Sequence, residues 1–113
     1  MSNAKLEALT QEFLAAYAAK DIDTIRSMFA ETVILRDWNL EVTGKDAAIR
    51  EFESNFQKSE HIEIKVNKLY SSGSGVSAEI KILVDKTEKL NVVDVLEFDE
   101  NQKILSIVSY KGL

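Results

Sequence analysis

The chain contains no cysteine and a single histidine, His61. Without cysteine it can form neither disulfide bonds nor thiolate metal sites, and one histidine cannot build a histidine-based metal centre. No apolar run is long enough to span a bilayer, and the N-terminal residues show no signal-peptide pattern. We therefore expect a protein without a bound metal, located in the cytoplasm and not associated with membranes.

Positive charge is also limited, because the formal net charge is −5. A protein that holds nucleic acid through phosphate contacts needs a basic surface, so we expect no nucleic-acid partner. The 113 residues are 45% hydrophobic and 29% charged, which is typical of a globular protein. This length supports one hydrophobic core and not two, so residues 1–113 are expected to form a single domain.

Apolar residues recur at helical spacing in three segments of the first half of the chain. Asp21 or Asp23 can cap the second of these helices. Thr43, with Asp46 three residues later, resembles a capping box at the start of the third. The helices are expected over about residues 4–20, 22–29 and 46–57.

Apolar and polar residues alternate in the remaining segments, which indicates β-strands separated by short turns. An order of helices first and antiparallel strands afterwards is typical of an α+β fold, with the helices on one face of a curved, mainly antiparallel sheet. The strands are expected over about residues 32–37, 40–42, 61–66, 76–84, 91–98 and 104–110.

Two aspartates share a strand face with apolar residues. Asp94 alternates with Leu96 and Phe98, and Asp37 alternates with Leu35. Burial favours the neutral form of a carboxyl group, and two neighbouring carboxyl groups titrate apart, which gives an acid and a base near neutral pH. Such a pair in a dry pocket can move a proton at a carbon next to a carbonyl without a metal or cofactor. The alternative is that each aspartate ends a strand and accepts backbone hydrogen bonds from a turn.

Three stretches together resemble one known superfamily: residues 13–23, residues 44–52, and residues 92–98 with 103–106. Their order is similar to that in the nuclear transport factor 2-like superfamily, and most similar to SnoaL-like polyketide cyclases and ketosteroid isomerase. The resemblance implies a cone-shaped fold in which three N-terminal helices pack on a curved sheet around an internal apolar pocket. It also implies chemistry that needs no cofactor.

The same resemblance implies roles for particular residues. Asp37 matches the base that moves a proton between carbons in ketosteroid isomerase, and Asp94 matches the protonated acid that hydrogen-bonds the developing oxyanion. The oxyanion-donating tyrosine of the isomerase falls on Phe13, which has no donor, while Tyr17 lies one helical turn later and can substitute. Trp38 stands where the isomerase has proline.

Two functions follow as hypotheses. The first is a cofactor-independent isomerase, cyclase or lyase that acts on a small apolar carbonyl compound, with Asp37, Asp94 and Tyr17 as the catalytic residues. The second is a module of the same fold that binds a ligand or dimerises without chemistry. The cavity is expected to be lined by Phe13, Tyr17, Trp38, Phe56, Leu96, Ile107 and Ser109.

Two of these aromatic residues also have ordinary structural interpretations. Tyr17 can be a core residue with its hydroxyl group at the surface, and Trp38 can fill the core rather than form the rim of a pocket.

The face of the sheet opposite the pocket also carries apolar residues, namely Val93, Val95, Val108 and Tyr110. Apolar residues on both faces of a sheet imply that the second face is covered as well. We expect a homodimer that buries this face, and members of the resembled family commonly pair in this way.

Overall fold

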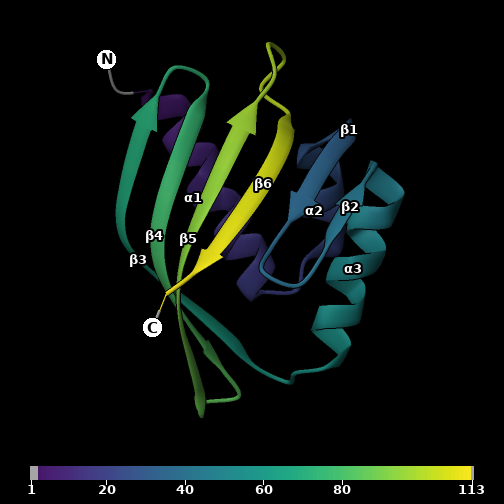
Figure 1. The fold of residues 1–113 in the computed structure, drawn as a ribbon, viewed down its shortest axis with the longest axis vertical. Helices are drawn as coiled ribbons and strands as arrows, with labels where there is room; N and C mark the ends of the chain where they lie inside the picture. Colours follow the sequence, from purple (N-terminus) through teal and green to yellow (C-terminus); the bar gives the residue numbers. More distant parts are fainter. Residues whose placement is uncertain (1–2, 113) are drawn as a thin grey trace.

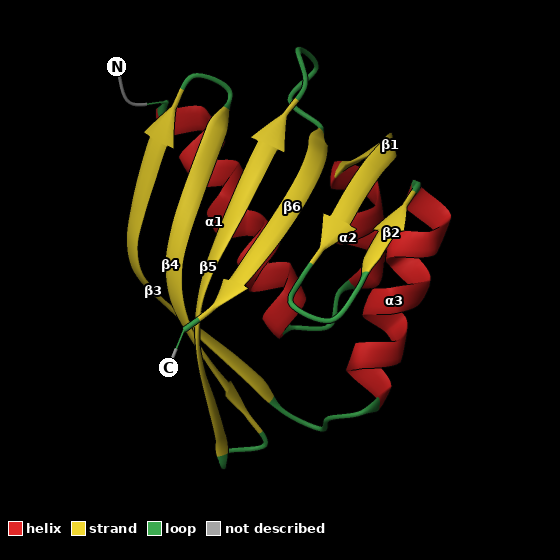
Figure 2. Cartoon of the chain, viewed as in Figure 1, coloured by secondary structure: helices red, strands yellow, loops and turns green. Residues whose placement is uncertain are grey.

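Three helices lie on one face of a six-stranded sheet in the computed structural model, which describes residues 3–112 (Figures 1 and 2). The helices are α1 (Ala4–Ala18), α2 (Ile22–Met28) and α3 (Lys45–Gln57). The strands are β1 (Phe29–Arg36), β2 (Glu41–Thr43), β3 (Ile62–Ser72), β4 (Gly75–Val84), β5 (Glu88–Phe98) and β6 (Ile104–Lys111). The predicted α+β class is confirmed, with each predicted helix present.

The sheet has the strand order β2-β1-β6-β5-β4-β3. Neighbouring strands are antiparallel except for β1 and β6, which pair in parallel. Most of the chain separates β1 from β6, and a long connection of this kind allows two strands to run in the same direction. The sheet is therefore mixed but mainly antiparallel, as predicted.

Of the two predicted helix caps, at the N-termini of α2 and α3, the first is correct and the second is wrong. Asp21 precedes α2, and its carboxylate accepts a hydrogen bond from the backbone N–H of Thr24 at 3.2 Å. The capping box predicted at Thr43 is wrong, because the residue before α3 is Gly44 and no side chain caps this helix. Gly44 has a φ of 97°, a conformation that favours glycine, and it turns the chain from β2 into α3.

The hydrophobic core lies between the helices and the inner face of the sheet. Phe29 is buried at the start of β1, and its ring centroid lies 6.2 Å from that of Phe13 and 5.8 Å from that of Phe52. Residues of β5 alternate as the sequence predicts, so that Leu96 faces the core and pairs with Ile107 of β6. Helix α1 packs on β3 and β4, and α3 packs on β1 and β2, which leaves room between the two helices and the sheet.

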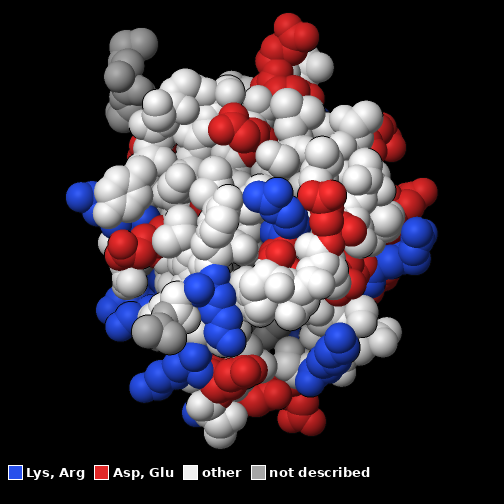
Figure 3. All heavy atoms as spheres, viewed as in Figure 1, with Lys and Arg blue, Asp and Glu red and all other residues white. Residues whose placement is uncertain are grey.

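The outer face of the sheet carries no helix among the described residues (Figures 1 and 2). Figure 3 shows mostly uncharged atoms on this face, with separate acidic and basic side chains both over the central strands and at the margins. Tyr110 and Ile34 are exposed there, and Val93, Val95 and Val108 are partly buried between their neighbours. No described helix combines the length and the hydropathy that crossing a bilayer requires.

Candidate functional site

A cavity of about 340 Å³ lies between the inner face of the sheet and the helices α1 and α3. Its walls are mainly isoleucine, leucine, valine and phenylalanine side chains, with a few polar groups among them. This combination is typical of small-molecule sites. Seven of the nine residues predicted for the site line this one cavity: Phe13, Tyr17, Asp37, Trp38, Asp94, Ile107 and Ser109.

Asp94 is the buried acid of the cavity, with only 8% of its surface exposed. It pairs with Ser109 across β5 and β6, and the Ser109 hydroxyl donates a hydrogen bond of 2.6 Å to Oδ1 of Asp94. On the other side of β5 it pairs with Ala78. Burial raises the pKa of Asp94 from 3.8 to about 6, although the Ser109 hydrogen bond works in the opposite direction.

Asp37 follows the last residue of β1 and has a structural role as well as a place in the cavity wall. Its Oδ1 accepts hydrogen bonds from the backbone N–H groups of Asn39 at 2.7 Å and Leu40 at 3.0 Å. Its own N–H donates to the carbonyl of Leu40. These contacts fix the turn into β2, as the turn interpretation of this aspartate predicts, while the residue still borders the cavity.

Tyr17 lies on α1 and lines the same cavity as both acids. Burial raises the pKa of its hydroxyl, a side-chain hydrogen bond with Asn55 of α3 partly opposes this, and the negative charges of Asp94 and Asp37 raise the pKa further. Both carboxylates therefore disfavour ionisation of the tyrosine hydroxyl. The ring itself is held edge-on by Phe52, at a centroid distance of 5.2 Å.

Two predicted lining residues lie outside the cavity wall. Leu96 is fully buried two ladder positions beyond Asp94, where it packs in the core. Phe56 lies behind the tyrosine, with its ring centroid 5.0 Å from that of Tyr17. Both residues belong to the hydrophobic core instead. Strand parity and helix periodicity predict which face of an element a residue occupies, but they do not predict whether that residue reaches the cavity.

Sequence reasoning missed Asn55, which contacts Tyr17, and the residues at the mouth, Lys58 and Glu88. Asn55 follows Phe52 by three positions, so the apolar stripe of α3 carried a signal that this amide faces inward. The mouth residues come from the end of α3 and the start of β5, which no local pattern connects. Trp38 also stands at this wall, 45% exposed, with Nζ of Lys111 at 5.7 Å from its ring centroid.

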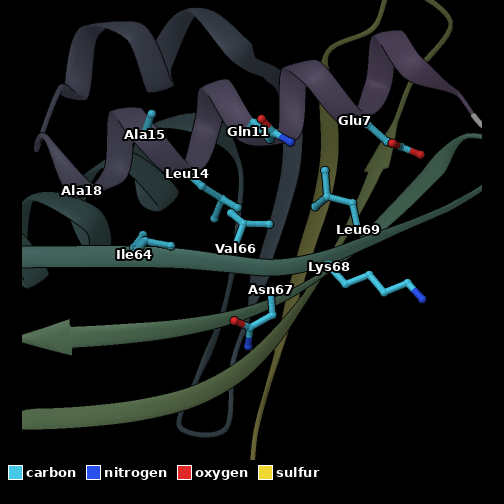
Figure 4. Close-up of a pocket in the computed structure, with 10 residues that line it drawn as sticks. All are labelled: Glu7, Gln11, Leu14, Ala15, Ala18, Ile64, Val66, Asn67, Lys68 and Leu69. Carbon is cyan, nitrogen blue, oxygen red and sulfur yellow. The ribbon is translucent and has the colours of Figure 1, made fainter.

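A second hollow, of about 590 Å³, runs along the surface between α1 and β3 (Figure 4). Leu14 and Val66 point toward each other there, while Lys68 points away from the helix. Glu7 at one end is hydrogen-bonded by Ser71. None of the polar side chains that line this groove is buried, so it is the weaker candidate. Within residues 3–112, no group of three or more metal-ligating side chains is found.

A family model described as a SnoaL-like domain matches residues 10–107 of the chain. The chain belongs to the SnoaL-like domain family. The match begins within α1 and ends within β6, so it includes all the cavity-lining residues except Ser109. Among curated proteins no match to this SnoaL-like domain was found.

Solved structures with the same fold include three that are similar over almost the whole SnoaL-like domain. The first is a putative SnoaL-like polyketide cyclase from Shewanella denitrificans, with a TM-score of 0.86, 13% identity, and coverage of 97% of this chain and 92% of that one. The second is an epoxide hydrolase from Mycobacterium tuberculosis described as LEH-like, with a TM-score of 0.84, 17% identity, and coverage of 96% and 84%. The third is a putative ketosteroid isomerase from Kribbella flavida, with a TM-score of 0.82, 15% identity, and coverage of 97% and 79%.

An NTF2-like protein from Cytophaga hutchinsonii also matches, with a TM-score of 0.80 over 99% of the chain. Together these neighbours confirm the predicted nuclear transport factor 2-like fold. At identities below 25% they establish the fold alone.

Proposed function

We propose that the SnoaL-like domain binds a small apolar carbonyl compound in its cavity and moves a proton at the carbon next to the carbonyl. One observation carries the proposal: the carboxyl group of Asp94 is buried in an otherwise mostly apolar cavity and has a pKa raised to about 6. A carboxyl group with a pKa close to neutral can both accept and return a proton at physiological pH.

The proposed step uses groups that face the same space. The ionised carboxylate of Asp94 removes a hydrogen from the carbon next to the carbonyl, which forms an enolate and leaves Asp94 protonated. The hydroxyl of Tyr17 donates a hydrogen bond to the enolate oxygen, and the protonated Asp94 then returns the proton to carbon. Asp94 is the preferred base, rather than Asp37, because one oxygen of Asp37 already accepts two backbone hydrogen bonds in its turn.

The proposal is tested by incubating the protein with a cyclic ketone such as 2-decalone in deuterium oxide. Between the two transfers the protonated Asp94 exchanges its proton with deuterium oxide through the open side of the cavity, so that deuterium is returned to the carbon. One-dimensional proton NMR follows the resulting loss of signal from the hydrogens next to the carbonyl. Exchange faster than the buffer alone, and saturable in the ketone, supports the proposal. Exchange at the buffer rate, with the ketone bound in the cavity, contradicts it.

Replacing Tyr17 with phenylalanine is expected to slow this exchange about tenfold, since the enolate loses one hydrogen-bond donor worth about 1–1.5 kcal/mol. The ketone should still bind, because the aromatic ring remains between Phe52 and Phe56. The measurement is the exchange rate at saturating ketone together with the dissociation constant. An unchanged rate would show that the hydroxyl does not contact the reacting oxygen.

A non-catalytic binding module is the second candidate, and a specific observation favours it. Phe13 takes the position of a donor in the resembled isomerase, and Asp37 is held by its turn. Under this alternative the ketone binds, and its contacts shift the NMR signals of Ile107 and Val92, but its hydrogens exchange no faster than in buffer. The exchange experiment separates the two candidates.

We also propose that two copies of the chain pair through the outer sheet face that carries Val93, Val95, Val108 and Tyr110. The support is that this apolar face has no helix over it among the described elements, whereas the inner face is covered. A contiguous apolar patch on a sheet is typical of a protein–protein interface.

The variant Val95→Asp is expected to convert this dimer into a monomer, because it places a carboxylate opposite Val108 in the centre of the patch. The measurement is the molar mass by light scattering at micromolar concentration. Thr87→Asp, an exposed change in the turn between β4 and β5, serves as the control and should leave the mass unchanged. A wild-type protein of monomeric mass would contradict the proposed pairing.

A further inference from the structure

Asp94 has no cationic partner among the described residues. The ion pairs found between residues 3 and 112 join Arg26 with Asp46, Lys45 with Glu31, and His61 with Glu63, and none of these residues lines the cavity. The only hydrogen bond to the Asp94 carboxylate in this part of the chain comes from Ser109 and reaches Oδ1. A buried carboxylate without a counter-charge is costly to ionise.

The second oxygen, Oδ2, is available to a ligand. Every fully buried polar side-chain atom within the described range has a hydrogen-bond partner, so an Oδ2 without a partner is not sealed in protein. Asp94 lines the cavity, and the residual 8% exposure of its surface is therefore toward that space. The partner of Asp94 on β4 is Ala78, whose side chain has no hydrogen-bond donor for Oδ2.

The other charges along the wall give the cavity a negative balance. Three carboxylates line it, those of Asp37, Glu88 and Asp94, against the single ammonium group of Lys58. Lys58 and Glu88 are exposed to solvent at the mouth, where water screens them, whereas Asp94 is buried. The charge that a bound molecule experiences most strongly is therefore that of Asp94.

We infer that the cavity is also a binding site for apolar amines in their protonated form, with the ammonium group on Asp94 and the hydrocarbon body against the aliphatic wall. This inference goes beyond the proton transfer proposed above, because it needs the cavity and its carboxylate but no reaction. The ammonium group supplies the counter-charge that the protein lacks and donates hydrogen bonds to Oδ2. The rings of Phe13, Tyr17 and Phe52, which contact one another and line the same cavity, add a favourable environment for a cation.

The test compares three molecules that share one rigid hydrocarbon body and differ in charge: 1-aminoadamantane, 1-adamantanol and adamantane-1-carboxylate. Dissociation constants are measured by calorimetry at pH 7.5, and the site is located by NMR shifts of the Val92 and Ile107 methyl groups, both in the cavity wall. We expect the amine to bind about tenfold more tightly than the alcohol and the carboxylate to bind about tenfold more weakly.

The variant Asp94→Asn should remove the preference for the amine while leaving the affinity for the alcohol within about threefold. Glu100→Gln, an exposed change in the turn before β6, is the matched control for the loss of one negative charge and should keep the preference. If the alcohol binds in the cavity and the amine binds no better, the inference is wrong while the pocket and the proposed reaction stand. If no probe shifts the methyl signals, both the inference and the proposed ligand site are overturned.

Discussion

Exchange of the hydrogens next to the carbonyl of a bound ketone is expected to fall about 10²–10⁴-fold when Asp94 is replaced with asparagine. Asparagine has nearly the same shape and still accepts the hydrogen bond from Ser109, but its amide cannot take up a proton. The loss should appear in the exchange rate at saturating ketone, because the aliphatic wall that binds the hydrocarbon is unchanged.

The same measurement on Asp37→Asn separates the two acids. If Asp94 is the group that moves the proton, Asp37→Asn slows exchange much less than Asp94→Asn does, and the change comes through the turn that Asp37 fixes. Glu100→Gln should exchange at the wild-type rate, because this residue lies in an exposed turn away from the cavity. An Asp37 variant with the larger loss would reverse the assignment of the base and return it to the role that the family resemblance implies.

The free energy of unfolding of the Asp94→Asn variant, relative to wild type, is expected to rise by about 3 kcal/mol between pH 3 and pH 7. In the unfolded chain the carboxyl group titrates near its ordinary pKa of 3.8, and in the folded protein at about 6. The folded state therefore holds the proton more tightly than the unfolded state. Below about pH 3 both states are protonated and burial carries no ionisation cost, whereas above about pH 7 both are ionised and the folded state bears the full cost.

Wild-type stability should accordingly decrease as the pH rises through this window, while the asparagine variant lacks this contribution. The measurement is urea unfolding of both proteins at several pH values, and the difference between them removes the other titrating groups. Glu100→Gln is again the control, with a difference from wild type that does not depend on pH across the window. A pH-independent difference for Asp94→Asn would mean that solvent reaches the carboxylate, and the case for a buried acid would then fail.

Much of the fold could be predicted because its determinants are local. Alternation in β5 placed Val92, Asp94 and Leu96 on one face, and all three are buried. Helical spacing located α1, α2 and α3, and the acid before α2 located its first turn. The capping box failed because Thr43 ends β2 and Gly44, rather than a hydroxyl group, makes the entry into α3.

The site was predictable in part for the same reason. Strand parity directed both aspartates to the inner face, but it contained no information on what Asp37 binds there, which turned out to be the backbone of its own turn. Nor could it separate Ile107, which reaches the cavity, from Leu96, its partner in the ladder, which does not.

The sequence by itself determined which residues form helices and strands and which faces are apolar, because both depend on the spacing of neighbours along the chain. Only the tertiary structure decided that Ser109 lies opposite Asp94, that Asn55 reaches Tyr17, and that Asp94 lacks a cationic partner within the described chain. Those relations join elements distant in sequence. The pKa of a carboxyl group depends on the solvent and the charges around it, and these exist only once the sheet and helices have closed around the cavity.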